Sequence, residues 1–278
     1  MSQVESHAQS PEVKCKPDGI RVWRGYRSAH YLDKREAFDK AVRQIFVPHT
    51  AQQMMPLGLA SYFPALLADW RQTDPSGHGR NDVQLILPDE IALVVYPSED
   101  AYRCAVKDNV AGRAYAMLHS PLFNFDDSSP IPMSLSGSPV PWDGEPALDQ
   151  AYSLREGAID WRAGELEVLL VARPPNWSVA EFQKRVAALV DDWNQGDSST
   201  VDGLIVVVSE HYCLVWQHRE PDSTVSLIAL LVDSLGTVQL RAMPRVVQVP
   251  HAFTRDDAGV DIEVGELLDV RLQAAAPD

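Results

Sequence analysis

The sequence predicts an α+β fold made of two successive modules, each with the order strand, helix, strand, strand, helix, strand. Three observations predict it. The chain has 278 residues, which exceeds the usual size of one domain. Strand-like apolar runs and amphipathic helical stretches follow one another in two series, and a polar stretch rich in Pro and Gly separates the series. The composition, 45% hydrophobic and 23% charged, is typical of a globular protein that buries a sizeable core.

The first module is predicted to span residues 20–123, after a flexible polar tail over residues 1–19. It opens with a strand over 20–27, where apolar or aromatic residues alternate with basic ones. Asp33 and Glu36 then have the spacing of a capping box, which predicts that a helix begins there.

The remaining elements of the first module are predicted from residues that begin or break helices and from apolar runs. Pro48 is expected to end the first helix or to begin a second short one, because proline lacks the backbone N–H of a helix interior. Two strands are expected within 59–70 and 91–96. A further helix is expected to open near Glu99 and to break near Gly112.

A linker is predicted over residues 124–164, because residues 124–150 are dominated by Ser, Pro, Gly and Asp. A lid over a pocket is the alternative for this long stretch. The second module follows over residues 165–250, and an acidic C-terminal segment over 251–278. The strands of the second module are expected within 166–172, 204–208, 214–217 and 238–249.

Two helices are expected in the second module. Ser178 and Glu181 form a capping box for the first, and Gly196 is placed as its C-cap. Asp222 is expected to cap the second, which reaches Leu235. The β-branched composition of its middle also allows a strand, but the cap and the length favour a helix.

The charge and the N-terminal sequence limit the partners and the location. A net charge of −15, without a basic run to offset it, disfavours nucleic acid and anionic membrane surfaces as partners. The N-terminus has no secretory leader pattern, and no apolar run is long enough to span a bilayer. The three cysteines form no CxxC pair, so neither a disulfide framework nor a structural metal site is expected. We therefore expect a cytoplasmic protein.

The two series of elements share a sequence pattern. Each opens with a strand, a capping pattern and a Phe near the helix start, and each later has a Pro before an acidic residue that opens a helix. This shared pattern favours two tandem ferredoxin-like βαββαβ modules with antiparallel sheets over an unrelated pair of domains.

One stretch resembles a known superfamily. The sequence IALVVYPSEDAYRCA, residues 91–105, is similar to the third strand and second helix of the dimeric α/β-barrel superfamily, which includes small cofactor-independent monooxygenases and related haem proteins. The resemblance covers residues 20–123 and, more loosely, 165–249. It implies two sheets paired face to face, either between two modules of one chain or across a homodimer, and by itself implies no particular function.

Polar and aromatic residues gather at element ends in the first module, where the placed polar groups of a ligand pocket converge. We expect a small-molecule pocket there, against the alternative that these residues only pack. In the first hypothesis the catalytic residues are His49, Tyr62 and His119, and the substrate-binding residues are Trp23, Tyr26, Arg113 and Tyr115.

The resemblance then implies an enzyme of the monooxygenase or cyclase kind that acts on a largely apolar organic substrate without a cofactor. The alternative is haem binding or haem-dependent catalysis, with His49 or His119 as the axial ligand. A third hypothesis is a non-catalytic binding or scaffold protein. No motif for a dinucleotide, a P-loop, a zinc protease or a serine hydrolase is present in the sequence.

Overall fold

The computed structural model describes most of the chain. The described residues are 12–67, 87–126, 128–131, 138–196, 201–219, 226–235, 239–242 and 265–267. They form an α+β structure with two sheets, each of which is mostly antiparallel.

The first sheet is built around three central strands from the first half of the chain. In their spatial order its strands are β11 (Gly265–Leu267), β2 (Ser61–Leu67), β3 (Glu90–Val95), β1 (Ile20–Gly25) and β4 (Ser129–Ile131). All neighbours are antiparallel except β11, which runs parallel to β2. The strands predicted within 20–27, 59–70 and 91–96 are confirmed as β1, β2 and β3.

Two helical arms connect these strands. The first arm consists of α1 (Arg35–Ala41), a π-helical segment (Val42–Phe46), α2 (Val47–Met54) and a 3₁₀ turn. The second consists of α3 (Glu99–Tyr102), a π-helical segment (Arg103–Asp108), α4 (Val110–Ala116) and a 3₁₀ turn over Met117–His119.

The helix boundaries depart from the sequence prediction at two points. The capping box at Asp33 is wrong, because α1 begins after Lys34 without a side-chain cap. Of the two alternatives for Pro48 the second is confirmed, since Pro48 lies in the first turn of the short helix α2, directly after the π-helical segment. The break in the second arm falls at Asn109, whose side chain caps α4, and Gly112 lies inside that helix.

The second sheet has six strands. In spatial order they are β10 (Gln239–Ala242), β7 (Glu165–Ala172), β9 (Tyr212–Arg219), β8 (Gly203–Val208), β6 (Ala151–Ser153) and β5 (Val140–Pro141). Its helices are α5 (Val179–Gln195) and α6 (Leu227–Leu235). The Ser178 cap is confirmed, since its hydroxyl accepts from the backbone N–H of Glu181, and the choice of helix for α6 is confirmed. The predicted Asp222 cap lies outside the described residues.

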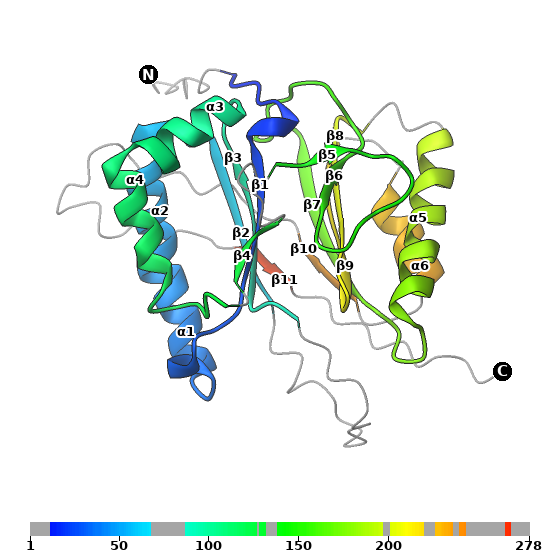
Figure 1. Ribbon diagram of the computed structural model, residues 1–278, viewed down its shortest axis with the longest axis horizontal. Coiled ribbons are helices and arrows are strands. Elements are labelled where there is room, and N and C mark those ends of the chain that lie inside the picture. Colours follow the sequence, from blue (N-terminus) through cyan, green and yellow to red (C-terminus); the bar gives the residue numbers. More distant parts are fainter. Residues whose placement is uncertain are drawn as a thin grey trace, which may run out of the picture.

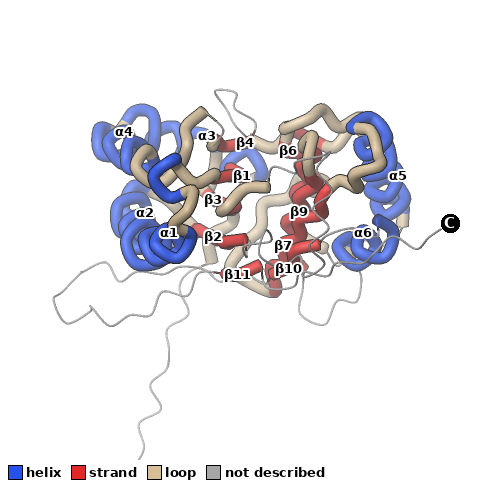
Figure 2. Tube along the Cα trace, turned by 90° about the horizontal axis from the view of Figure 1, so that it is seen from below, coloured by secondary structure: helices blue, strands red, loops and turns tan. Residues whose placement is uncertain are grey.

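The molecule has four layers, which Figures 1 and 2 show from two sides. The two sheets lie face to face at the centre, the helices from α1 to α4 cover the outer face of the first sheet, and α5 and α6 cover the outer face of the second. The sheets therefore pair within one chain. Buried side chains from both sheets form a single apolar cluster between them, which includes Val22, Phe63, Leu93, Leu170, Val207 and Trp216.

Three segments outside the two predicted modules contribute to the sheets or their edges. Within the predicted linker, β4 joins the first sheet, and β5 and β6 join the second. Within the acidic C-terminal segment, β11 pairs with β2. In the predicted flexible tail, Cys15 exchanges two backbone hydrogen bonds with Ile159, of 2.8 and 3.1 Å. These contacts are one to three residues long, which is too short for a periodic pattern to reveal.

None of the helices in the described part of the chain is both long and apolar enough to cross a membrane.

Candidate functional site

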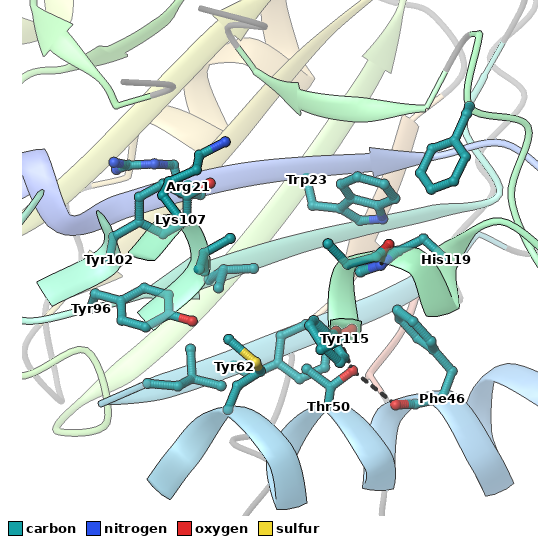
Figure 3. A pocket seen from close by; sticks show the side chains of 16 residues that line it. Arg21, Trp23, Phe46, Thr50, Tyr62, Tyr96, Tyr102, Lys107, Tyr115 and His119 are labelled. Carbon is teal, nitrogen blue, oxygen red and sulfur yellow. Dashed lines mark hydrogen bonds between the residues drawn. The ribbon is translucent and has the colours of Figure 1, made fainter. Parts of the chain in front are cut away.

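A cavity of about 240 Å³ lies between the outer face of the first sheet and the helices that cover it. Figure 3 shows the side chains around it. Its walls are largely aromatic and aliphatic. The lining residues are Arg21, Trp23, Phe46, Thr50, Met54, Leu59, Tyr62, Val94, Tyr96, Tyr102, Val106, Lys107, Tyr115, Ala116, His119 and Phe125.

Strand and helix periodicity place these residues on the cavity wall. Side chains alternate between the two faces of a strand, so Val22 points into the core between the sheets while Trp23 points toward the helices. In the second helical arm, Tyr115 and His119 are four residues apart and lie on one face. The polar groups of two sheet strands and two helical arms therefore meet in one cavity.

A buried carboxylate lies behind the sheet wall of the cavity. Glu90, the first residue of β3, is fully buried. Its Oε2 accepts a hydrogen bond of 3.0 Å from the indole nitrogen of Trp23, and its Oε1 accepts one of 2.9 Å from the hydroxyl of Tyr62. Burial raises the pKa of Glu90 to about 7, although both hydrogen bonds favour the charged form. Burial and the neighbouring Glu90 charge raise the pKa of Tyr62, which stays a neutral phenol.

A pair of hydroxyl groups occupies the helix side. The Thr50 hydroxyl donates to the backbone carbonyl of Phe46 over 2.8 Å and lies 2.6 Å from the Tyr115 hydroxyl. Because the single Thr50 proton is used in the first bond, Tyr115 donates in the second. Burial raises the pKa of Tyr115 as well.

His119 lies in an aromatic surround. The centroids of the Trp23, Phe46 and Tyr115 rings are 4.9, 4.8 and 5.2 Å from that of its imidazole. Its Nδ1 lies 3.0 Å from the Ala116 carbonyl oxygen, which can only accept, so the proton is on Nδ1 and Nε2 carries the lone pair. Burial lowers the pKa of His119 to about 4. At neutral pH it is an uncharged group with one basic nitrogen.

The structure brings together four of the seven residues predicted from the sequence: Trp23, Tyr62, Tyr115 and His119 all line the cavity. The other three do not line it. Tyr26 lies near Tyr212 of the second sheet, on the opposite face of the first sheet, and burial raises its pKa. Arg113 is exposed and donates to the Lys107 carbonyl oxygen over 2.7 Å. His49 lies on α2 and is half-buried.

Sequence reasoning missed Glu90 and Thr50. The signal for Glu90 was its position, because Glu90, Ala92, Val94 and Tyr96 alternate with inward-facing apolar residues along β3 and so share the helix-facing side. Thr50 lies four residues after Phe46 on one helix face, which marks it as part of the same wall. No group of three or more His, Cys, Asp or Glu side chains that could hold a metal ion occurs among the residues that the structure describes.

No family model matches the chain, and no curated protein matches it in sequence. Among solved structures, a proposed monooxygenase from Fusobacterium nucleatum is 10% identical, with a TM-score of 0.31 over 82% of this chain and 91% of its own. A proposed monooxygenase from Lactobacillus acidophilus is 7% identical, with a TM-score of 0.31 over 82% and 92%. A dye-decolorizing peroxidase from Bacteroides thetaiotaomicron is 9% identical, with a TM-score of 0.31 over 87% and 94%.

Proposed function

We propose that the chain is an enzyme that removes a proton from a small, largely apolar organic substrate, in a reaction of the cofactor-independent monooxygenase or cyclase kind. The observation that carries this proposal is the pairing of Glu90 with Tyr62 and Trp23 on the wall of an aromatic cavity that also holds a neutral His119. Perturbed titratable groups that converge in an apolar cavity are typical of active sites.

A second part of the proposal concerns the fold of each half of the chain. Strands β2, β3, β1 and β4 lie side by side in that order, and β8, β9, β7 and β10 lie in the corresponding order in the other half. In each half the chain order is strand, helix, strand, strand, helix, strand. We infer that each half is a ferredoxin-like module, and that the two modules pair their sheets within the chain.

In the proposed reaction His119 is the general base. Its Nε2 accepts a proton from an activated C–H or O–H group of the substrate, while Nδ1 stays bonded to Ala116. A base with a pKa near 4 is weak, so the substrate must already be acidified. Tyr62 supplies that effect when Glu90 is protonated, because the Glu90 carboxyl then donates to the Tyr62 oxygen and the Tyr62 hydroxyl donates to the substrate oxygen on which negative charge develops.

Glu90 acts through Tyr62. While Glu90 is ionised, the Tyr62 hydroxyl donates to it and has no proton for the substrate. Because the pKa of Glu90 is about 7, the protonated form, in which this hydrogen bond is reversed, is also populated near neutral pH. Glu90 is therefore a positioning residue and a proton store for Tyr62. Trp23 keeps the carboxylate oriented.

In the monooxygenase form of the proposal, dioxygen is the oxidant. A CH₂ group of the substrate loses two hydrogens, one oxygen atom becomes a carbonyl at that carbon, and the other leaves with both hydrogens as water. In the cyclase form, the same proton removal gives a carbanion that attacks a carbonyl carbon of the same substrate molecule. The carbon–carbon bond forms as the carbonyl π bond breaks, and the resulting alkoxide takes the proton back from His119. Both forms begin with the step that His119 performs.

The size of the cavity argues against the haem alternative. Pockets for drug-sized ligands usually measure about 300–1,000 Å³, whereas this cavity measures about 240 Å³. Three aromatic rings also lie around His119 at centroid distances of 4.8 to 5.2 Å. The other proposed haem ligand, His49, does not line the cavity. We assign no step to haem.

The test is turnover of a panel of phenols and enolisable ketones with one to three rings, followed by oxygen uptake and product mass. We expect His119→Gln to lower kcat at least about 100-fold, as the loss of a general base does, and Tyr62→Phe to lower it about tenfold. His49→Gln is the matched control and should keep the parent kcat. Compounds that bind without turnover would identify a binding protein instead. Intact turnover in both cavity variants would refute the roles assigned here.

A further inference from the structure

A guanidinium group without a charged partner lies on the wall of the cavity. Arg21, on β1, is only 2% exposed and lines the cavity. Its Nη1 donates to the backbone carbonyl oxygens of Asp18 and Ile20, each over 2.7 Å. Its Nε and Nη2 are buried and have no hydrogen-bond partner among the residues that the structure describes.

The two unpartnered nitrogens belong to one edge of the guanidinium. In arginine the N–H bonds of Nε and Nη2 run parallel, and this edge matches the two oxygens of a carboxylate. The face of the group is already covered, because the guanidinium carbon lies 3.9 Å from the centroid of the Tyr102 ring. The bond to backbone carbonyls and the stacking on Tyr102 hold the group in place and leave that edge available.

No carboxylate of the described residues comes within the 4.0 Å ion-pair distance of Arg21. Burial lowers the pKa of Arg21, and Tyr102 and the charges of Glu99 and Asp18 oppose this by a smaller effect. A buried arginine remains charged, and a buried charge without a partner is costly. A ligand that brings a negative charge would remove this cost.

Lys107 provides a second positive charge at the same cavity. Its side chain is exposed and lines the cavity from the second helical arm. Figure 3 shows Arg21, Lys107 and Tyr102 gathered on one side, and Trp23 and His119 on the other. The cavity therefore has a cationic end and a proton-accepting end, with apolar walls between them.

We propose that the cavity binds a small aromatic or otherwise largely apolar carboxylate, whose carboxylate group pairs with the Nε and Nη2 edge of Arg21. The proposal rests on the proposed function in that it names the substrate class of the same site. Anchoring at Arg21 directs the apolar body of the ligand toward His119 and Tyr62. Lys107, at the exposed side, attracts the anion and adds to its binding.

The test compares carboxylates with neutral molecules of the same shape. Benzoate and 1-naphthoate are titrated against benzamide and 1-naphthamide. The readouts are isothermal titration calorimetry and the fluorescence of Trp23, which is separated from that of the other six tryptophans by comparison with Trp23→Phe. In the parent protein we expect the carboxylate of at least one pair to bind about tenfold more tightly or better, as a charge-assisted bidentate pair gives.

The variants locate this preference. Arg21→Met is expected to abolish it, and Arg21→Lys to reduce it, because lysine keeps the charge but lacks the fork. Lys107→Met should weaken carboxylate binding less than Arg21→Met does. Arg103→Met is the matched control, since Arg103 is an exposed residue that does not line the cavity. Circular dichroism checks that each variant is folded, and Arg21→Lys serves if Arg21→Met is not.

Equal binding of acid and amide to the parent, no binding of any probe, or a preference that survives both substitutions of Arg21 would overturn the proposal. Its failure is distinct from that of the proposed function, because it is read from binding alone. His119→Gln should keep the preference for the carboxylate. If His119→Gln also kept full turnover, the general-base role of His119 would be refuted, whereas the proposed carboxylate site at Arg21 would be unaffected.

Discussion

The indole nitrogen of Trp23 lies 3.0 Å from Oε2 of Glu90 and donates a hydrogen bond to it. The same indole packs edge-on against His119, with the ring centroids 4.9 Å apart. One side chain thus touches both titratable groups of the candidate site. Burial shifts their pKa values in opposite directions, to about 7 for Glu90 and to about 4 for His119.

These opposite shifts predict opposite effects of pH on stability. Glu90 binds its proton more tightly in the folded state, so its contribution is fully present below pH 4.5 and is lost as the pH rises to about 7. His119 binds its proton less tightly in the folded state, so its contribution is present above pH 6.5 and is lost as the pH falls to about 4. Between pH 4.5 and 6.5 the two effects nearly cancel in the parent.

Each single substitution should uncover the effect of the other group. Relative to the parent, Glu90→Gln should make the protein less stable toward low pH, and His119→Gln should make it less stable toward neutral pH. Each change amounts to at most about 3 kcal/mol across the range. Urea unfolding at steps of half a pH unit measures it. Glu156→Gln, at an exposed carboxylate, is the control, and slopes of the same sign in the two variants would contradict the prediction.

A second prediction concerns the hydroxyl pair of Thr50 and Tyr115. Thr50→Val leaves the Tyr115 hydroxyl without its acceptor and should cost about 1–3 kcal/mol, whereas Thr50→Ser keeps the hydroxyl and should cost less. In Thr50→Val/Tyr115→Phe neither unpaired group remains. We therefore expect the double variant to lose less stability than the sum of the single variants, by about 1 kcal/mol in a urea double-mutant cycle. Strict additivity would mean that the two hydroxyls do not interact.

The cavity shows what a sequence can and cannot predict about such a site. Trp23 and Tyr62 stand out because each combines an aromatic ring with a hydrogen-bonding group, which is the kind of side chain that lines a ligand pocket. Glu90 does not, because one acidic residue before an apolar run resembles the polar flank of any strand. Its meaning comes from Trp23, which is 67 positions away. Periodicity indicates which face a residue occupies, but not which distant residue lies opposite it.

The same limit applies to the fold. Strands of six to eight residues, such as β1 and β7, have enough alternation or apolar length to be predicted. The three-residue strands β4, β6 and β11 do not, and they form only because a longer strand already offers a free edge. The π-helical segments that contain Phe46 and Ala105 are a further example. A π-helical turn shifts the direction in which the following side chains point, and capping residues, which mark only helix ends, do not predict it.

A third prediction concerns the contact between the two halves of the chain. Arg24 of β1 and Asp149 form an ion pair of 2.6 Å, and the Asp149 backbone N–H donates to Val208 of the second sheet. Asp149 has a positive φ of 57°, which Asn tolerates better than Ala. Asp149→Asn should cost about 1 kcal/mol for the lost ion pair, and Asp149→Ala about 1 kcal/mol more for the backbone. Equal midpoints of thermal unfolding in the two variants would show that the backbone conformation carries no cost.

The last prediction tests whether the position of α4 controls the cavity. A Cβ at Gly112 would lie 1.9 Å from the carbonyl oxygen of Ala105, a backbone atom that cannot rotate away. Gly112→Ala must therefore push α4 off the preceding helical segment, although alanine is the better helix former. Tyr115 and His119 follow on the same helical arm, so they would move relative to Thr50 and Trp23.

For Gly112→Ala we expect the free energy of unfolding to fall by at least about 2 kcal/mol, and Trp23 fluorescence to respond more weakly to bound 1-naphthoate. Gly157→Ala, where a Cβ meets nothing within 4 Å, is the matched control and should change neither quantity. If Gly112→Ala were as stable as the parent, the close approach of α4 would not be what positions the helix side of the cavity.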